Sequence, residues 1–285
     1  TGRVIDPDHV VARRFVGPIG EFCALLTAEL TSGATGGATS GQPSRSPEWM
    51  AGWVRAEAQA QVAISAVISD DSMCEPAVSR LLTSAAVRPG THLVVASSMP
   101  IRDVEWFGSN GEGVTVHSNR GANGIDGVIS TGIGVALGSA RPTVVLLGDI
   151  AMCHESSSLT ALARRHLDLA IVVVDNDGGA IFSFLPQATA LSDEQFEQLF
   201  GTPHGTDIVA LAAAHGLPAV TVESPAELLA AVHRNGPCVV RVASDRAANV
   251  ACHGRLHAAV AAAVSVPASM APPVRVPVQV QVQGD

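Results

Sequence analysis

Lysine and tyrosine are both missing from this chain of 285 residues, and all 17 of its cationic residues are arginines. A chain without lysine cannot form a pyridoxal-phosphate Schiff base, carry a Walker A phosphate loop or use a serine–lysine acyl-transfer pair. A chain without tyrosine cannot use a phenol as its acid or base. The formal net charge of −9 disfavours a nucleic-acid or acidic-membrane surface, because neither attracts a net anion. We therefore expect no nucleic-acid partner.

The five cysteines are scattered, and no two of them form a C-x-x-C pair. The sequence therefore indicates neither a disulfide framework nor a zinc knuckle, which suits a reducing cytoplasm. The N-terminus lacks the pattern of a signal peptide, and the apolar runs are much shorter than the roughly 18–20 residues that cross a bilayer. We expect a soluble cytoplasmic chain without a membrane span. Its first residue, Thr1, indicates processing or a fragment.

Short apolar runs alternate with helical patterns from about Arg88 onward. Almost continuously apolar strands suit a parallel sheet that is covered on both faces, so the pattern predicts an α/β fold with a doubly wound parallel sheet. The expected strands are residues 92–97, 114–117, 143–147, 169–174, 219–222 and 238–242. The expected helices are 19–30 and 48–65 before this region, and 124–139, 156–166, 207–215 and 226–234 within it.

The segments around this α/β domain, which we place at residues 88–266, differ from it in composition. Residues 19–30 and 48–65 show helical periodicity, so we expect a separate N-terminal segment at residues 1–30 and a helical lead-in at residues 48–87. Residues 31–47 are mainly Gly, Ser, Thr and Pro, which is typical of a flexible linker. The closely spaced prolines of residues 267–285 predict a disordered tail.

Polar, glycine-containing loops follow two consecutive strands of the expected sheet, where open parallel sheets bind ligands. Gly148 and Asp149 follow the third expected strand, and Asn176 and Gly178 follow the fourth. Asp149 and Asn176 are 27 positions apart, the length of one strand–helix–strand unit, so their strands can lie about 4.8 Å apart. A carboxylate, an amide oxygen and a glycine carbonyl would then converge in a set suited to Mg²⁺. An ordinary pair of turns is the alternative.

Other features of these strand ends suit a phosphorylated ligand and an anionic substrate. Gly148 would let a diphosphate approach the backbone, and a helix expected to open at Ser156 would add N–H donors and a favourable dipole. Arg120 lies in a loop with three glycines, and Arg102 ends a segment that also leaves a strand. Two arginines above one sheet edge would suit substrate carboxylates, although each taken singly is as readily a solvated or salt-bridged residue.

These motifs resemble those of thiamine-diphosphate enzymes, whose signature is Gly-Asp-Gly, a spacer of this length and Asn-Asn. More narrowly, the chain resembles the family of 2-succinyl-5-enolpyruvyl-6-hydroxy-3-cyclohexene-1-carboxylate synthases of menaquinone biosynthesis. Four segments carry this resemblance: SNRGANGIDGVISTGIG, GDIAMCHESSSL, VVDNDGGAIFSFLP and FGTPH. It implies that 2-oxoglutarate is decarboxylated and that the succinic semialdehyde anion equivalent is added to isochorismate, with the cofactor supplying the ylid and the electron sink.

The resemblance also implies roles for individual residues. The side chains of Asp149 and Asn176 and the carbonyl of Gly178 would hold Mg²⁺, or Mn²⁺ in its place. Further contacts to thiamine diphosphate would come from Ser98, Ile125, Gly148 and Ile150. Contacts to substrate would come from Arg102, Arg120, Ile181 and Phe182. For the apolar residues, ordinary core packing is the alternative.

The sequence departs from the family pattern in three respects. Ile150 replaces the second glycine of the general signature. Asp175 stands where the family often has asparagine, which is unfavourable beside a diphosphate unless the side chain points away. The family also has a pyrimidine-binding first domain and a central domain, and the resemblance implies that residues 1–30 are a remnant of the central domain. The activating glutamate of the first domain has no counterpart here, so no catalytic residue is assigned. We therefore expect the isolated chain to bind Mg²⁺–diphosphate weakly and to turn over nothing.

The resemblance further implies a homo-oligomer, a dimer or a tetramer, because such enzymes build the active site across two subunits. Two other functions remain open. One is a different thiamine-diphosphate 2-oxo-acid decarboxylase or an enzyme like acetohydroxyacid synthase. The other is a non-catalytic cofactor-binding module. Arg102 and Arg120 favour a dicarboxylate substrate over pyruvate, whereas the missing glutamate favours the non-catalytic module for the isolated chain.

Overall fold

The computed structural model describes residues 17–32, 47–68, 73–109, 111, 113–119 and 124–265. The chain divides into two compact units, residues 1–50 and 51–285, and the sheet belongs to the second. The expected linker at residues 31–47 falls almost wholly outside the described residues, and the expected tail at residues 267–285 does so completely. No described helix combines the length and the hydropathy needed to span a bilayer.

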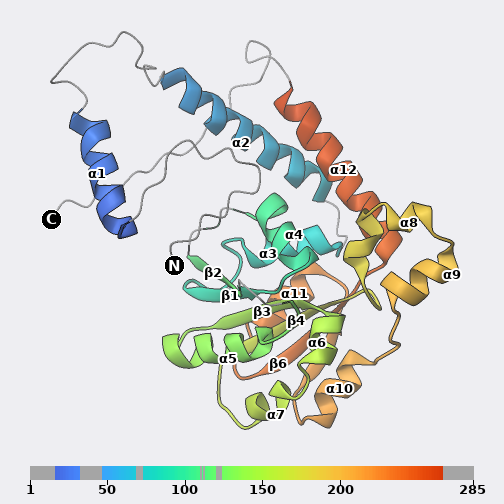
Figure 1. The fold of residues 1–285 in the computed structure, drawn as a ribbon. Coiled ribbons are helices and arrows are strands. Elements are labelled where there is room, and N and C mark those ends of the chain that lie inside the picture. Colours follow the sequence, from blue (N-terminus) through green and yellow to red (C-terminus); the bar gives the residue numbers. More distant parts are fainter. Residues whose placement is uncertain are drawn as a thin grey trace. The chain divides into compact units, whose positions relative to one another are not determined.

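Six parallel strands form the sheet of the described α/β region, in the order β2-β1-β3-β4-β6-β5 (Figure 1). The strands are β1 (Thr91–Val95), β2 (Val114–Ser118), β3 (Thr143–Gly148), β4 (Leu169–Asp175), β5 (Ala219–Val222) and β6 (Cys238–Ala243). All six expected strands are present, with ends that shift by no more than two residues. The predicted α/β class with a doubly wound parallel sheet is confirmed.

Helices precede the sheet and connect its strands. The longer helices are α1 (Ile19–Ser32), α2 (Pro47–Ile68), α3 (Glu75–Leu82), α4 (Met99–Phe107), α5 (Val128–Ser139), α11 (Pro225–Val232) and α12 (Arg246–Val264). The shorter ones are α6 (Asp149–His154), α7 (Ser158–Ala163), η1 (Ala180–Phe184), α8 (Gln187–Ala190), α9 (Asp193–Phe196), η2 (Glu197–Gly201) and α10 (Ile208–Ala214). The expectation of one helix opening at Ser156 is wrong, because α6 begins directly after β3 and α7 follows as a separate helix.

Buried side chains of the central strands alternate between the two faces of the sheet, as the period of two in a strand requires. On one face, Val145 of β3 and Ile171 of β4 pack in a cluster with residues from α5, α6, α7 and α10. On the other face, Leu146 and Val172 pack with residues from α3 and α11. All seven residues of β4 are buried, which explains why that strand reads as an unbroken apolar run.

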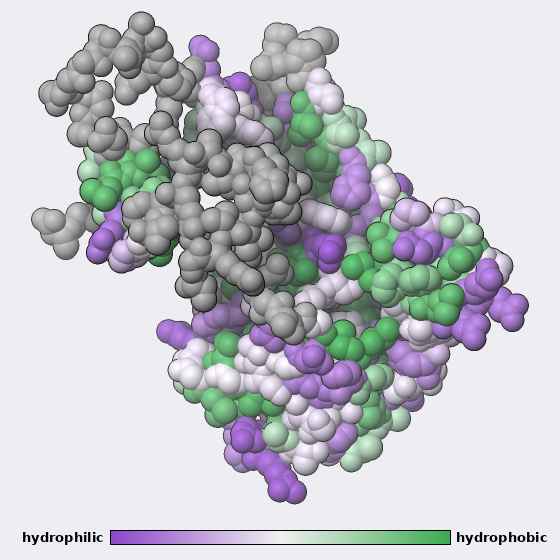
Figure 2. Space-filling model, viewed as in Figure 1, coloured by the Kyte–Doolittle hydropathy of each residue, from purple (hydrophilic) through white to green (hydrophobic). Residues whose placement is uncertain are grey.

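Gly132 of α5 allows this helix to pack closely on the sheet. A Cβ atom at this position would lie 2.2 Å from Cγ2 of Val145. Gly132 therefore serves the close packing of α5 on the sheet. On the face drawn in Figure 2, apolar side chains are interspersed with hydrophilic ones over the α/β body. Several of the expected site residues lie at the carboxyl ends of the strands.

Candidate functional site

The structure brings three of the expected metal-binding residues together at the carboxyl ends of β3 and β4. These strands are direct neighbours in the sheet. Oδ2 of Asp149 accepts hydrogen bonds from the backbone N–H groups of Asn176, at 3.1 Å, and Gly178, at 3.0 Å. Oδ1 of Asp149 accepts one from the N–H of Ile150 at 2.7 Å. We call Asp149, Asn176 and Gly178 the strand-end cluster.

The loop after β4 can approach Asp149 only because residue 178 is a glycine. Gly178 has a φ of +141°, which residues with a side chain rarely adopt. A Cβ atom there would lie 1.9 Å from the carbonyl oxygen of Gly201. The next residue, Gly179, donates its N–H to that same oxygen at 2.8 Å. The close contact with Gly201 therefore holds the backbone of the loop in place.

Asp149 is almost completely buried, with 1% of its surface exposed. Burial is the main cause that raises the pKa of its carboxyl group, and the charge of Asp175 acts in the same direction. The hydrogen bonds from the N–H groups of Gly178 and Ile150 offset part of this rise because they favour the ionised form. An anionic oxygen ligand held in such surroundings is suited to a divalent cation.

The remaining oxygens of the strand-end cluster are also suited to bind Mg²⁺. Oδ1 of Asn176 is buried and has no hydrogen-bond partner among the described residues. Its amide nitrogen, in contrast, donates to Oε1 of Glu75 at 3.0 Å. The carbonyl of Gly178 accepts one hydrogen bond, from the N–H of Ala180, and keeps a second lone pair. A carboxylate, an amide oxygen and a carbonyl are the hard ligands that Mg²⁺ prefers.

A second geometric set overlaps this cluster. One ligand atom each from Asp149, Asp175 and His204 lies within 4.8 Å of the others. Nδ1 of His204 accepts a hydrogen bond from the N–H of Thr206 at 3.0 Å, so the neutral ring carries its proton on Nε2, the atom 3.4 Å from Asp149. A protonated nitrogen does not ligate a metal. The strand-end cluster therefore fits a metal better than the set that contains His204.

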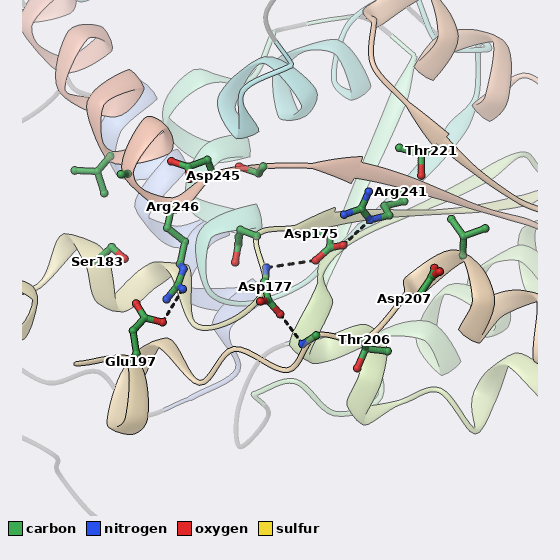
Figure 3. Close-up of a pocket in the computed structure, with 16 residues that line it drawn as sticks. Asp175, Asp177, Ser183, Glu197, Thr206, Asp207, Thr221, Arg241, Asp245 and Arg246 are labelled. Carbon is green, nitrogen blue, oxygen red and sulfur yellow. Dashed lines mark hydrogen bonds and ion pairs between the residues drawn. The ribbon is translucent and has the colours of Figure 1, made fainter. Parts of the chain in front are cut away.

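The extra acid at position 175 is compensated from the neighbouring strand. Oδ2 of Asp175 accepts a hydrogen bond from Nε of Arg241 on β6 at 2.5 Å. This ion pair answers the electrostatic objection raised by the sequence, because the charge of Asp175 is balanced locally. Figure 3 shows Arg241 turned toward Asp175 and Arg246 turned toward Glu197. Both pairs line a cavity of about 1200 Å³ that also borders Asn176.

The expected cofactor contact at Ser98 lies at the end of β1, which is the other neighbour of β3. The backbone of Ser98 has a φ of +72°, a conformation that costs energy for a residue with a side chain and is often found at functional sites. Its carbonyl accepts a hydrogen bond from Arg102 at 2.6 Å, so the expected substrate-binding arginine lies over the first turn of α4.

The other expected residues are placed in different surroundings. Ile125 packs against the core cluster that includes α5. Ile181 and Phe182 lie on η1, directly after the loop that follows β4, and the Phe182 ring is 5.2 Å from that of Phe200. Ile150 lies in the first turn of α6. Arg120 lies outside the described residues.

Sequence reasoning missed two residues that contact the strand-end cluster. His204 was part of the FGTPH segment but received no role, although that segment was the signal that could have found it. Glu75, the first residue of α3, contacts Asn176 across 101 positions of sequence, and no motif indicated it. Burial above all, and then the charge of Asp103, raises the pKa of Glu75 to about 7.

Part of the chain is similar to a known type of domain. Residues 108–242 match the family described as "Thiamine pyrophosphate enzyme, C-terminal TPP binding domain". The fold is that of this cofactor-binding domain. The strand-end cluster lies inside the matched region, whereas Glu75 precedes it.

Three similar curated proteins share one name, "2-succinyl-5-enolpyruvyl-6-hydroxy-3-cyclohexene-1-carboxylate synthase". The protein of Myxococcus xanthus (strain DK1622) is 42% identical over 207 residues, which cover 70% of this chain and 35% of the relative. That of Chloroflexus aurantiacus (strain ATCC 29366 / DSM 635 / J-10-fl) is 42% identical over 203 residues, 70% of this chain and 34% of the relative. That of Rubrobacter xylanophilus (strain DSM 9941 / JCM 11954 / NBRC 16129 / PRD-1) is 38% identical over 258 residues, which cover 88% of this chain and 42% of the relative.

The chain thus spans between about a third and two-fifths of the length of the curated relatives it matches. It resembles the C-terminal portion of these synthases.

Proposed function

We propose that this chain is the diphosphate-binding part of a thiamine-diphosphate-dependent synthase that decarboxylates 2-oxoglutarate and adds the resulting anion equivalent to isochorismate. The similarity to synthases of that name supports the reaction. The observation that carries the site is the buried, unpartnered oxygen of Asn176 beside the carboxylate of Asp149. An amide oxygen left without a donor in such a place is explained by a cation.

In this proposal the strand-end cluster holds Mg²⁺, or Mn²⁺ in its place, through Asp149, Asn176 and the carbonyl of Gly178. Further contacts to the cofactor come from Ser98, Ile125, Gly148 and Ile150. When bound, thiamine diphosphate supplies the ylid and the electron sink for decarboxylation. The protein binds and orients this group, and the hydrogen bonds to Asp149 keep the carboxylate in one position.

The substrate contacts of this proposal are Arg102 and Arg120 for the carboxylates, with Ile181 and Phe182 as apolar walls. Arginine suits this role because its planar fork donates two parallel hydrogen bonds to a carboxylate. To engage a substrate, Arg102 must release the carbonyl of Ser98 or share its donors with it. Two positive charges favour the dicarboxylate 2-oxoglutarate over pyruvate.

The proposal also includes what this chain does not supply. The chain covers between 34% and 42% of the three synthases compared above. We propose that turnover needs a pyrimidine-binding domain with its activating glutamate, that the working enzyme is a homo-oligomer, and that this chain alone turns over nothing. A cytoplasmic location, favoured by the scattered cysteines, belongs to the same proposal.

Calorimetry of thiamine diphosphate binding in the presence of Mg²⁺ tests the site. Asp149→Asn should weaken metal-dependent binding about ten- to hundredfold, because an anionic oxygen ligand is lost. Asp193→Asn, in exposed α9, is the matched control and should leave the affinity unchanged. Equal affinities for the Asp149→Asn variant and the unaltered protein would show that the metal assignment is wrong.

Turnover with a pyrimidine-binding domain supplied tests the reaction. We expect decarboxylation of 2-oxoglutarate in preference to pyruvate, and Arg120→Ala should raise the KM for 2-oxoglutarate far more than it changes cofactor affinity. Preference for pyruvate would favour a different 2-oxo-acid decarboxylase. Turnover of 2-oxoglutarate by this chain alone would overturn the proposed need for a second domain.

A further inference from the structure

The side-chain amide of Asn176 has two chemically different ends, and the structure treats them differently. Nδ2 donates to Oε1 of Glu75 at 3.0 Å. Oδ1 is buried without a hydrogen-bond partner among the described residues. The backbone N–H of the same residue donates to Oδ2 of Asp149, which ties its main chain to the strand-end cluster. Rotation about the bond between Cβ and Cγ would exchange Oδ1 and Nδ2, so a neighbouring group has to determine which of the two atoms faces the strand-end cluster.

Glu75 is held in a position from which it can fix the orientation of the Asn176 amide. It is the first residue of α3 and has 3% of its surface exposed. The oxygen that contacts Asn176 also accepts a hydrogen bond from Oγ of Ser244 at 2.8 Å. Ser244 is itself fixed, because its backbone N–H donates to the carbonyl of Asp175 at 2.8 Å. The carboxylate of Glu75 is thus anchored to the ends of both β4 and β6.

We propose that Glu75 is a positioning residue that turns the side-chain oxygen of Asn176 toward the divalent cation. Oε1 of Glu75 accepts hydrogen bonds from both Nδ2 of Asn176 and Oγ of Ser244, so this oxygen binds the NH₂ end of the amide and leaves the oxygen end facing the other way. This inference rests on the proposed function, because it takes Asn176 as a metal ligand. It assigns a role to a residue outside the region matched by the cofactor-binding domain.

Loss of this selection weakens the metal site without removing any ligand. In a Glu75→Gln variant the new amide can donate to the oxygen of Asn176 as well as accept from its nitrogen, so both orientations of Asn176 are stabilised. In the wrong orientation an NH₂ group faces the cation. Partners of this kind, one shell beyond the ligands, typically contribute about ten- to hundredfold to metal affinity.

The test measures Mn²⁺ binding to the whole chain in the presence of thiamine diphosphate, from the loss of the electron paramagnetic resonance signal of free Mn²⁺. Glu75→Gln should raise the Kd for Mn²⁺ about tenfold or more. Glu105→Gln, an exposed glutamate of α4, is the matched control and should change it less than about twofold. Circular dichroism and the midpoint of thermal unfolding without metal confirm that the variants are folded.

A pair of further variants separates orientation of the amide from a merely structural role. Asn176→Asp offers oxygen at both ends but places a carboxylate against that of Glu75, so it should bind Mn²⁺ poorly. Adding Glu75→Gln to Asn176→Asp restores a hydrogen bond between the two side chains, in which the amide at position 75 donates and the carboxylate at position 176 accepts. The double variant should therefore bind Mn²⁺ at least about fivefold more tightly than either single variant. Should Glu75→Gln fail to fold, the comparison of Asn176→Asp with the double variant decides.

Two outcomes would overturn the role of Glu75. One is an unchanged Kd in Glu75→Gln while Asp149→Asn, measured alongside, binds Mn²⁺ weakly. The other is a double variant that binds no more tightly than Asn176→Asp. If Asp149→Asn also binds Mn²⁺ as the unaltered protein does, the proposed metal site itself is wrong, and the role of Glu75 fails with it.

Discussion

The protein buries two polar clusters that differ in construction. The strand-end cluster joins the loops after two neighbouring strands, and one of its oxygens has no partner among the described residues. The second, which we call the helix cluster, joins Asp103 of α4 to His253 and Asn249 of α12. Nε2 of His253 lies 2.6 Å from Oδ1 of Asp103, and its Nδ1 lies 2.9 Å from the carbonyl of Asn249. The strand-end cluster leaves an amide oxygen without a partner beside a carboxylate. In the helix cluster the carboxylate of Asp103 and both ring nitrogens of His253 are paired, while the side-chain amide of Asn249 is buried without a partner among the described residues.

Burial shifts the pKa values of the two ionisable groups of the helix cluster in opposite directions. It lowers the pKa of His253, but the hydrogen bond with Asp103 and the charge of that residue outweigh burial and raise the pKa overall. Burial raises the pKa of Asp103, and the hydrogen bond with His253 offsets part of that rise. A closed pair of this kind holds α4 against α12, and Phe107 packs beside the histidine ring. The helix cluster is therefore expected to affect stability rather than binding.

The largest expected effect comes from opening the helix cluster. His253→Ala should lower the free energy of unfolding by about 3–5 kcal/mol, because it leaves Asp103 buried without its partner. Urea denaturation measures this. His233→Ala, at the exposed end of α11, is the control and should change the free energy of unfolding by about 0.5 kcal/mol or less. A loss below about 1 kcal/mol for His253→Ala would contradict the distinction between the clusters.

A somewhat smaller loss is expected from the backbone of the strand-end cluster. Gly178→Ala should cost about 3 kcal/mol, since the new Cβ atom meets the carbonyl of Gly201 at 1.9 Å in a conformation that favours glycine. Gly205→Ala is the matched control, because its φ is +59° but nothing lies within 4 Å of the added atom. It should cost about 1 kcal/mol. Equal losses from the two variants would show that the close approach to Gly201 has no energetic weight.

The dependence of stability on pH distinguishes the clusters further. The folded-state pKa of His253 is raised above the ordinary value of 6.5, so the folded protein binds more protons there than the unfolded chain. This contribution is present below pH 6.5 and is lost as the pH rises through the raised value. The titratable groups that face the ring are Asp103, Glu75 and His257.

Urea denaturation at several pH values measures this slope. In His253→Gln the free energy of unfolding should fall less steeply above pH 6.5 than in the unaltered protein. The fall that remains is due to Glu75, whose raised pKa also makes the folded protein less stable as the pH rises. A slope that is unchanged in the variant would show that His253 is not the titrating group.

The smallest effect is expected where two charges meet at the surface. Arg88 and Asp168 lie 3.5 Å apart, with side chains that are 27% and 41% exposed. Arg88→Ala should lower the free energy of unfolding by about 0.5 kcal/mol, because solvent screens such pairs. Urea denaturation in the same buffer gives the comparison with His253→Ala. A loss as large as that of His253→Ala would show that ion pairing alone, and not burial, accounts for the strength of the helix cluster.

Much of the sheet and the strand-end cluster could be predicted because both follow from local patterns. Mostly apolar strands of six and seven residues lie at the centre of the sheet, and Asp149 and Asn176 each come directly after one of them. Helix boundaries were less predictable. The spacer after Gly148 contains two short helices where one was expected, since Asp149 starts α6 at once.

What the sequence by itself determined is the order of the six strands along the chain and the approach of Asp149 to Asn176, because a single crossover connects two neighbouring parallel strands. Only the tertiary structure decided that Glu75 meets Asn176 across 101 positions, and that Arg241 meets Asp175 across 66. Such contacts depend on how α3 and β6 pack around β4, and packing between distant segments has no period that a sequence displays. The same physical reason hid the pair of Asp103 and His253, 150 positions apart, from sequence reasoning.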